Sequence, residues 1–319
     1  MKNCNQKARR HEGKAPVCLR ASVPSCLRAL LLCASLLLAS GCCRCGKKSP
    51  PYTGKTEPLE TVIENINANN QKLPTLWAHQ NYTVILVDPK NNKTHRVDGG
   101  GTLLYRRQRD FRLTGTSVAG RIFDIGSNDD RFWVMVLPEV STLWWGNYRN
   151  IGEPCMREIP IRPDMVLGVL GVATLSDNLL KSPMPVMRFN NDEDAYMVTW
   201  VVKGVDRLLA VKEVWYDRQT LRPRLVLLYD ESGRVALRAY LSRYVQVDLE
   251  NVAKSDRPWV ASNYDLFFPE TKTKMTLSLS DVQLEARGFP NDRSFVLRTD
   301  DPLKLGVNRV IQIDADCGQ

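Results

Sequence analysis

The chain has 319 residues, of which 43% are hydrophobic and 25% charged, and its 44 Lys and Arg residues exceed its 35 Asp and Glu residues by nine. Seven of these bases but only one acid precede Cys42, so most of the excess positive charge lies in the first 41 residues and the rest is nearly neutral. A nearly neutral body lacks the basic surface that nucleic-acid binding requires, and its length suits one large domain or two small ones.

The N-terminal segment has the pattern of an export signal. Its apolar run, Ala29–Leu38, is too short for a membrane-spanning helix, which needs about 20 apolar residues, but it suits a signal-peptide core. Three small residues then stand directly before Cys42. The stretch Leu36–Cys42 resembles the bacterial lipobox, in which the signal is cut before the cysteine and the cysteine is acylated. The resemblance implies a signal peptide over residues 1–41 and lipid attachment at Cys42. The alternative is an ordinary signal peptide followed by an accidental cysteine.

Residues 42–56 predict a lipid anchor followed by a flexible tether, because Gly, Lys, Ser, Pro and Thr predominate after the cysteines. Cys43 and Cys45 are spaced like part of a metal tract. A structural zinc site usually has four Cys or His ligands, however, and only His79 and His95 follow, neither at a suitable spacing. No metal site is expected.

The rest of the chain offers little catalytic chemistry. Two cysteines, Cys155 and Cys317, lie far beyond the anchor; a disulfide between them is allowed in an oxidising compartment, but spacing alone leaves the pairing open. The glycines Gly99–Gly101 lack the spacing of a dinucleotide-binding loop, and no nucleophile or zinc-protease motif is present. We therefore expect no enzyme activity and no cofactor.

One domain is predicted from residue 57 to residue 312, and it begins with a helix. Leu59, Val62, Ile63 and Ile66 form one apolar stripe at helical spacing, which needs a sheet to pack on. Short strands separated by Gly, Asn, Asp and Pro turns follow, as in an antiparallel meander. The expected strands are Tyr82–Val87, Thr94–Val97, Thr102–Arg106, Phe111–Thr116, Arg121–Ile125, Arg131–Leu137 and Thr142–Tyr148.

The middle of the chain differs from this pattern. Met165–Val172 is apolar on every side, which predicts either a buried core helix or a helix that covers an apolar opening. Leu175–Leu180 is expected to continue the irregular helical region. Strands then return, and near Ser280 the apolar alternation shifts by one residue, which predicts a β-bulge or a bend. The clearest later strands are Tyr196–Val202, Leu208–Tyr216, Leu225–Tyr229 and the alternating stretch Val235–Leu241.

The segment Gly101–Leu113 resembles the early strands of the periplasmic lipoprotein carriers of the LolA/LolB superfamily. Their pattern is a Gly-led apolar strand, then Arg-Pro, two variable residues and Phe. Arg107 and Phe111 match it, although Gln108 replaces the proline. The turn and aromatic strand Ser127–Val134 are also similar, and the order of elements looks alike over most of residues 57–298. The resemblance implies an α+β, mainly β fold: a curved antiparallel sheet, an unclosed half-barrel, with helices covering its concave apolar face.

The same resemblance implies a function. The cavity of these carriers holds acyl chains, and the matching arginine and phenylalanine help to close and reopen it. The soluble carrier is unlipidated whereas its outer-membrane receptor is a lipoprotein, so Cys42 favours a receptor-like protein. That receptor has an apolar residue on a protruding loop, which makes Val118 the corresponding candidate. The resemblance thus implies an envelope lipoprotein, anchored in the outer membrane facing the periplasm, that binds acyl chains of lipoproteins or other lipids and accepts them from a periplasmic carrier. The alternative is a structural or sensory envelope lipoprotein with the same fold and no transport role.

Overall fold

The computed structural model describes residues 54–87, 92–107, 109–118, 120–138, 140–151, 153, 155–156, 159, 161–297 and 305–317. These residues belong to one compact unit, Pro50–Gln319. The predicted signal peptide, Cys42 and most of the predicted tether lie outside the described residues. Within the described part, no helix is long and apolar enough to cross a membrane.

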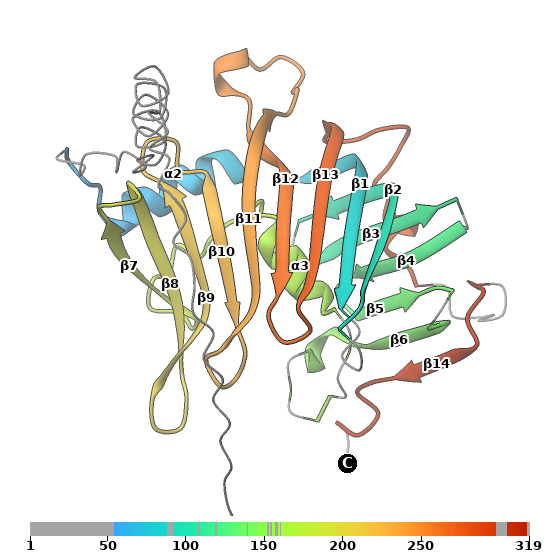
Figure 1. The fold of residues 1–319 in the computed structure, drawn as a ribbon. Helices are drawn as coiled ribbons and strands as arrows, with labels where there is room; N and C mark the ends of the chain where they lie inside the picture. The colour runs from blue at the N-terminus through green and yellow to red at the C-terminus, as the bar shows by residue number, and fades with distance from the viewer. Residues whose placement is uncertain are drawn as a thin grey trace, which may run out of the picture. The chain divides into compact units, whose positions relative to one another are not determined.

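Fourteen strands of the described residues form one sheet (Figure 1). Its order is β14-β6-β5-β4-β3-β2-β1-β13-β12-β11-β10-β9-β8-β7, and because β14 and β7 stand at opposite ends, the sheet is unclosed. Neighbouring strands are antiparallel, except that β14 lies parallel to β6. The fold is therefore mainly β, as the turn spacing predicts.

The bounds are as follows. Among the described residues, the α-helices are α2, Leu59–Asn70, and α3, Pro163–Val169. The first strands are β1, Thr75–Val87; β2, Thr94–Arg106; β3, Asp110–Ser117; β4, Gly120–Ser127; β5, Arg131–Val136; and β6, Thr142–Asn147. The later strands are β7, Met184–Asn190; β8, Ala195–Lys203; β9, Leu208–Asp217; β10, Pro223–Tyr229; β11, Val235–Gln246; β12, Trp259–Phe268; β13, Thr273–Gln283; and β14, Arg309–Gln312. Short 3-10 turns lie at Tyr148–Asn150, Lys254–Asp256 and Asp292–Phe295.

One face of the sheet, here called the inner face, carries the main hydrophobic core. Side chains alternate between the two faces of a strand, so the register decides which residues meet. Tyr264 of β12, Leu277 of β13 and Tyr82 of β1 stand opposite one another in neighbouring strands, and all three are buried. Burying each such side chain stabilises the fold by about 1.5–3 kcal/mol. The core thus runs continuously across the middle of the sheet.

Both helices contribute to this core. The apolar stripe predicted for the first helix is confirmed, because Val62, Ile63 and Ile66 of α2 are buried. In α3, Val166 and Val169 are buried with the same cluster. The segment that ends α3 is fixed by the Tyr264 hydroxyl, which donates to the Leu170 carbonyl at 3.3 Å. At its other side α3 approaches β4 and β5. A single short helix therefore contacts strands that are far apart in the sheet order.

The predicted continuation of the helical region through Leu175–Leu180 is wrong; this segment consists of turns and bends. Two asparagines of α2 explain the difference. The Leu175 N–H donates to Asn67 Oδ1 at 2.7 Å, and Asn67 Nδ2 donates to the Leu175 carbonyl at 2.9 Å. Asn70 Nδ2 likewise donates to the Ala173 carbonyl at 2.8 Å. Because side chains satisfy these backbone groups, the segment does not need a helix.

The predicted shift of phase in the last long strand is confirmed. Trp77 of β1 pairs with Gln283 and His79 pairs with Ser280, so β13 has one extra residue there, and Asp281 has a positive φ of 51°. Strand β1 itself begins at Thr75, seven residues before the predicted start. Its early part carries a glutamine, Gln80, on the inner face, which hides the apolar alternation from sequence inspection.

The outer face of β3–β6 is covered by the C-terminal segment. Arg112 and Asp124 form a two-point ion pair, Nη2 to Oδ2 at 2.7 Å and Nε to Oδ1 at 3.0 Å. Asp124 also accepts a hydrogen bond from Trp133 Nε1, and Arg112 donates to the Ser294 carbonyl. This pair therefore joins the outer face to the segment that packs over it, where Trp133 and Val307 belong to a second hydrophobic cluster.

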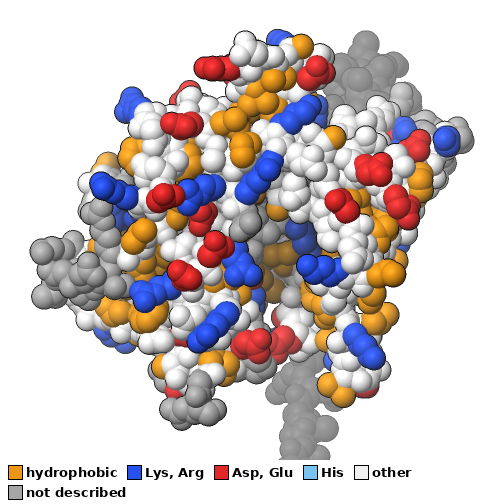
Figure 2. All heavy atoms as spheres, turned by 180° about the vertical axis from the view of Figure 1, so that it is seen from behind, with side chains coloured by type: hydrophobic (Ala, Val, Ile, Leu, Met, Phe, Trp, Pro, Cys, Tyr) orange, Lys and Arg blue, Asp and Glu red, His pale blue; other side chains and the backbone are white. Residues whose placement is uncertain are grey.

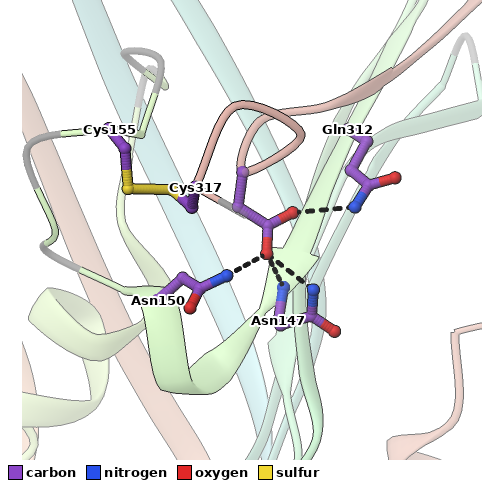
Figure 3. Close-up of a disulfide and its surroundings, with 6 residues drawn as sticks. Asn147, Asn150, Cys155, Gln312 and Cys317 are labelled. Atoms are coloured by element: carbon purple, nitrogen blue, oxygen red, sulfur yellow. Dashed lines mark hydrogen bonds between the residues drawn. A yellow bond between two sulfur atoms is a disulfide. The ribbon is translucent and has the colours of Figure 1, made fainter. Parts of the chain in front are cut away.

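Cys155 and Cys317 form a disulfide, which resolves the pairing that spacing left open (Figure 3). The two Cα atoms are 5.1 Å apart and 162 positions apart in sequence. Beside the disulfide, Asp314 accepts hydrogen bonds from the backbone N–H and side chain of Asn147, from Asn150 and from Gln312, at 2.7–3.0 Å. Burial opposes the charge of this carboxylate, but the hydrogen bonds outweigh it and lower its pKa.

Candidate functional site

The sequence-predicted site residues lie in three separate places. Arg107 is exposed in the turn after β2 and donates a hydrogen bond to the Gln71 carbonyl at the end of α2. Phe111, in β3, is fully buried in the inner-face core. Val118 is fully exposed in the turn after β3, at the opposite end of that strand from Arg107. The structure does not bring these three side chains together, and Cys42 lies outside the described residues.

Two cavities flank the beginning of α3. The first has a volume of about 570 Å³ and lies against β1 and the β12–β13 hairpin. The second has a volume of about 430 Å³ and lies between α3 and strands β8, β9 and β10. Ile161 lines the first and Arg162 lines the second, so the chain entering α3 separates them. Figure 2, from behind, shows a hollow near the middle of the molecule, with hydrophobic side chains inside and basic side chains at its rim.

Apolar side chains form most of both cavity walls. The first is lined by Val84, Leu86, Val87, Asn92, Ile161, Phe268, Glu270, Thr271, Lys272, Thr273 and Met275. The second is lined by Arg162, Asp164, Met165, Gly168, Val202, Leu209, Val211, Lys212, Leu228, Tyr229, Asp230 and Glu231. Volumes of about 300–1,000 Å³ with apolar walls and a few polar groups are typical of sites for small organic ligands.

Both cavities lie at the same end of the strands, near the turns that connect them. The first is bordered by the β1–β2 and β12–β13 connections, and the second by the start of the β10–β11 turn. In an antiparallel meander, alternate turns lie at the same end of the strands. The β3–β4 turn, which carries the exposed Val118, therefore lies at the same end of the strands as the cavities. The β2–β3 turn, which carries Arg107, lies at the other end.

A β-bulge shapes the wall of the second cavity. Trp200 of β8 pairs with Lys212 of β9, but the next residue of β8, Val201, pairs with Ala210. Val211 is therefore the extra residue, and the bulge lets Val211 and Lys212 line the same cavity although they are adjacent in sequence. A charged side chain is thus directed into the cavity beside the apolar side chains of β8, β9 and β10.

Lys212 is half-buried and has few polar neighbours. Its Nζ donates to the Gly168 carbonyl of α3 at 3.0 Å and lies 5.5 Å from the centre of the Trp200 ring. Burial lowers the pKa of this ammonium group to about 8. Within the described residues, no carboxylate oxygen lies within 4.0 Å of it.

The other charges of the second cavity are arranged differently. Arg162 Nη2 and Asp164 Oδ2 form an ion pair at 2.6 Å, and Asp230 pairs with Arg234 at 2.8 Å. Glu231 is exposed in the turn after β10. Two of the three acids therefore already have cationic partners other than Lys212.

Sequence inspection missed Lys212, although a signal was present. In the expected strand Leu208–Tyr216, Lys212 shares its phase with Val214 and Tyr216, which are buried on the inner face. A lysine in the inward-facing phase of a strand is a candidate for a site. For the described residues, no cluster of His, Cys, Asp and Glu side chains is suited to hold a metal ion.

No protein-family model matches the chain, and no curated protein matches it. Among solved structures, the chain is similar to an outer membrane lipoprotein-sorting protein domain from Vibrio parahaemolyticus, at 14% identity and a TM-score of 0.47 over 74% of this chain and 95% of that one. It is similar to a DUF1329 family protein from Desulfovibrio piger, at 12% identity and a TM-score of 0.47 over 76% and 100% of the two chains. It is also similar to a LolA superfamily protein from Nitrosomonas europaea, at 15% identity and a TM-score of 0.43 over 76% and 99%.

Proposed function

We propose that this protein is a lipid-anchored lipoprotein of the bacterial envelope that binds acyl chains in the apolar space between α3 and the sheet. The single observation that carries the proposal is the pair of cavities, about 570 and 430 Å³, on either side of the chain entering α3. In this proposal residues 1–41 are a signal peptide, Cys42 carries the lipid, residues 42–56 are the tether and residues 57–312 form the binding domain.

The proposal includes a half-barrel whose concave face holds α3. Its support is a comparison of lengths. In the sheet order, β4 and β9 are eight strands apart, which in a flat sheet is about 38 Å at about 4.8 Å per strand. The seven residues of α3 span only about 10 Å. Since α3 approaches β4 and also meets β9 through Lys212, a sheet curved around the helix accounts for both contacts.

In this arrangement α3 serves as both core and cover. Val166 and Val169 bury one side of the helix in the core, whereas Met165 and Gly168 line the second cavity. An acyl chain that enters beside the helix gains about 0.8 kcal/mol for each CH₂ group removed from water. Binding then needs no catalytic group, and the cavity walls supply the affinity.

The residues suggested by the LolA/LolB resemblance keep proposed roles. Arg107 holds the β2–β3 turn to the end of α2, so breaking this contact would loosen the helix from the sheet. Phe111 is proposed to hold β3 in the inner-face core, in which it is buried. Val118, which is exposed at the same end of the strands as the cavities, is proposed to touch the membrane or a carrier protein during transfer of acyl chains. A larger side chain would insert into a membrane more strongly, which makes Val118 a weak anchor.

A structural or sensory lipoprotein without transport is the second candidate, and one observation favours it. Val166, Val169 and Leu170 are 3%, 1% and 2% exposed, so the centre of the inner face is already filled by side chains of this region. A protein that never accepts a ligand would pack its centre in this way. The two candidates differ in whether the flanking cavities are occupied in the cell.

A pair of substitutions at Gly168 tests the proposal. A Cβ atom there would lie 3.8 Å from Leu228 Cδ1, an ordinary contact, so both Gly168→Ala and Gly168→Leu fit the helix. Only leucine extends far enough to occupy the 430 Å³ cavity, and alanine is the matched control because it also removes the helix-destabilising glycine. Protein that lacks the lipid anchor is purified under conditions that keep bound lipid in place, and this lipid is then measured by native mass spectrometry.

We expect lipid to copurify with the wild type and with Gly168→Ala, and to decrease with Gly168→Leu while the far-UV circular dichroism stays unchanged. A wild-type protein with a clean mass and no extractable lipid contradicts acyl-chain binding and favours the second candidate. Equal lipid content in all three proteins would place any lipid outside the second cavity.

A further inference from the structure

Lys212 has an unusual combination of position and partners. It lies in the wall of the second cavity because the bulge at Val211 turns two consecutive side chains of β9 toward the same space. Removing an ammonium group from water is costly unless a partner of opposite charge replaces the water. The position of this lysine among apolar side chains of β8, β9 and β10 therefore requires an explanation.

The charges around Lys212 do not provide that partner. The charged or titratable groups of the cavity come from α3 with the residue before it, from β9, and from the end of β10 with its turn, whereas β8 contributes the apolar Val202. Asp164 is paired with Arg162 and Asp230 with Arg234, while Glu231 is exposed in its turn. The remaining titratable group is Tyr229. In the described residues the cation of Lys212 is not neutralised by any acid within 4.0 Å.

The ammonium group also has donors to spare. It has three N–H donors, and one of them reaches the Gly168 carbonyl at 3.0 Å. The Trp200 ring, 5.5 Å away, attracts the cation through its face but accepts no conventional hydrogen bond. Two N–H donors are therefore available to a group that enters the 430 Å³ cavity.

We propose that the second cavity binds an acyl chain with an anionic head group, a carboxylate or a phosphate, and that the head group accepts hydrogen bonds from Lys212. The walls next to Lys212 suit the tail, since Met165, Val202, Leu209 and Leu228 are apolar. This inference rests on the proposed acyl-chain binding and deepens it, because it selects acidic single-chain amphiphiles over uncharged lipids. Hydrogen bonds between charged groups are roughly twice as strong as those between neutral ones, so the head group is a source of selectivity.

A purely structural role for Lys212 is the competing explanation. A lysine that donates to a carbonyl near the end of a helix stabilises that helix, and Lys212 does so for α3 through Gly168. Such a role predicts that substitution changes stability but leaves the choice between charged and uncharged ligands unaltered. The choice of ligand is therefore the readout that separates the two explanations.

The test uses full-length protein purified in detergent and three photoreactive probes with the same tail: palmitic acid, palmityl phosphate and palmityl alcohol, each carrying a diazirine and an alkyne. Labelled peptides are quantified by mass spectrometry. The variants are Lys212→Met, Lys212→Arg, which keeps the charge, and Lys274→Met, the matched control at an exposed lysine of β13 that does not line the cavities.

In the wild type we expect at least one acidic probe to label cavity peptides about tenfold more than the alcohol, the ratio that a charge-assisted hydrogen bond supplies. The acidic probe that labels more strongly identifies the head group. Lys212→Met should reduce the acidic labelling to the level of the alcohol without reducing alcohol labelling, whereas Lys212→Arg and Lys274→Met should retain the preference.

Equal labelling by acid and alcohol in the wild type would overturn the inference while leaving acyl-chain binding intact. The same holds if Lys212→Met keeps the preference for acid. If no probe labels cavity peptides in any protein, the proposed acyl-chain binding fails together with the inference, so the two failures are distinguishable.

Discussion

Replacing Lys212 by methionine should make the ligand-free protein more stable. In the absence of an anion, the desolvation of the Lys212 ammonium group lowers the free energy of unfolding. Methionine has a similar length and no charge, so it fills the same wall. The pKa of Lys212 is lowered from 10.5 to about 8 by burial. This difference corresponds to about 3 kcal/mol, at about 1.4 kcal/mol for each pH unit.

Part of that gain is lost with the contact to α3. The substitution removes the hydrogen bond from Nζ to the Gly168 carbonyl, which contributes about 1 kcal/mol. The expected net gain at pH 7 is therefore about 2 kcal/mol, equivalent to an increase of roughly 4–8 °C in Tm for a protein of this size. Urea unfolding of delipidated protein, followed by tryptophan fluorescence, measures it.

The pH dependence gives a second, independent check. The folded-state pKa of Lys212 lies below its unfolded value, so between pH 8 and 10 the unfolded state binds more protons and the free energy of unfolding rises with pH. Of the other groups lining the cavity, Arg162 has a raised pKa and Asp230 a lowered one, so both keep their charges in this window, and burial raises the pKa of Tyr229 above its usual 10. Asp164 and Glu231 complete the charged lining.

In the wild type the free energy of unfolding should thus increase from pH 8 to 10 relative to Lys212→Met, and Lys274→Met should follow the wild type. Above pH 10 the buried tyrosines reverse the trend, because their pKa values are raised in the folded state. A Lys212→Met protein that is less stable than the wild type at pH 7, or one with the same pH slope, would refute the reasoning.

Four further predictions concern the disulfide, two acidic side chains and the anchor. Double replacement of Cys155 and Cys317 by serine should reduce the free energy of unfolding in urea by up to about 5 kcal/mol, from a loop of 162 residues, and should abolish sensitivity to reductant; an unchanged midpoint contradicts the disulfide. Asp124→Ala should cost about 3–5 kcal/mol in the same assay, because it leaves the charge of its arginine partner without its acid, and a loss below about 1 kcal/mol would argue against that pairing. Because the pKa of Asp314 is lowered, its contribution is present above pH about 4 and lost as pH falls below that, so Asp314→Asn should flatten the acid limb of the stability curve; an unaltered limb would assign the acid sensitivity to other groups. Cys42→Ser should leave the domain folded but release it from membranes in fractionation, and a membrane-bound variant would contradict lipid attachment there.

The sequence predicted the strands best where turn residues bound them. Strands β3 to β6 match their expected ranges within a few residues, because Gly, Asn or Pro separates short runs rich in apolar and aromatic residues. Even the bulge near Asp281 was visible, since a shift of phase is a property of the sequence itself. The first half of β1 was missed because Gln80 occupies an inward position, where its Nε2 donates to the Thr114 carbonyl at 2.8 Å.

The site was much less predictable. Whether Lys212 reaches a cavity depends on a bulge in β9 and on where α3 lies, and both require long-range pairings that one strand does not encode. The disulfide likewise joins residues whose proximity depends on the path of the whole C-terminal segment. Arg107 and Phe111 came from a motif and Val118 from the place of a loop, and neither kind of comparison gives the distances between the residues it identifies.

An unclosed sheet has two edges, and each edge can recruit strands from other molecules. At one end, β7 contains Pro185, which cannot donate to a neighbouring strand, and is thereby protected against such pairing. At the other end, the protection of β6 depends on four residues of β14 and on the disulfide that fastens the chain just after them. This cap forms only after β14 has paired with β6 and the disulfide has closed. Until then the tryptophans of β6, Trp144 and Trp145, border an open edge, so the incompletely folded chain passes through an aggregation-prone stage whose length depends on how fast the disulfide forms.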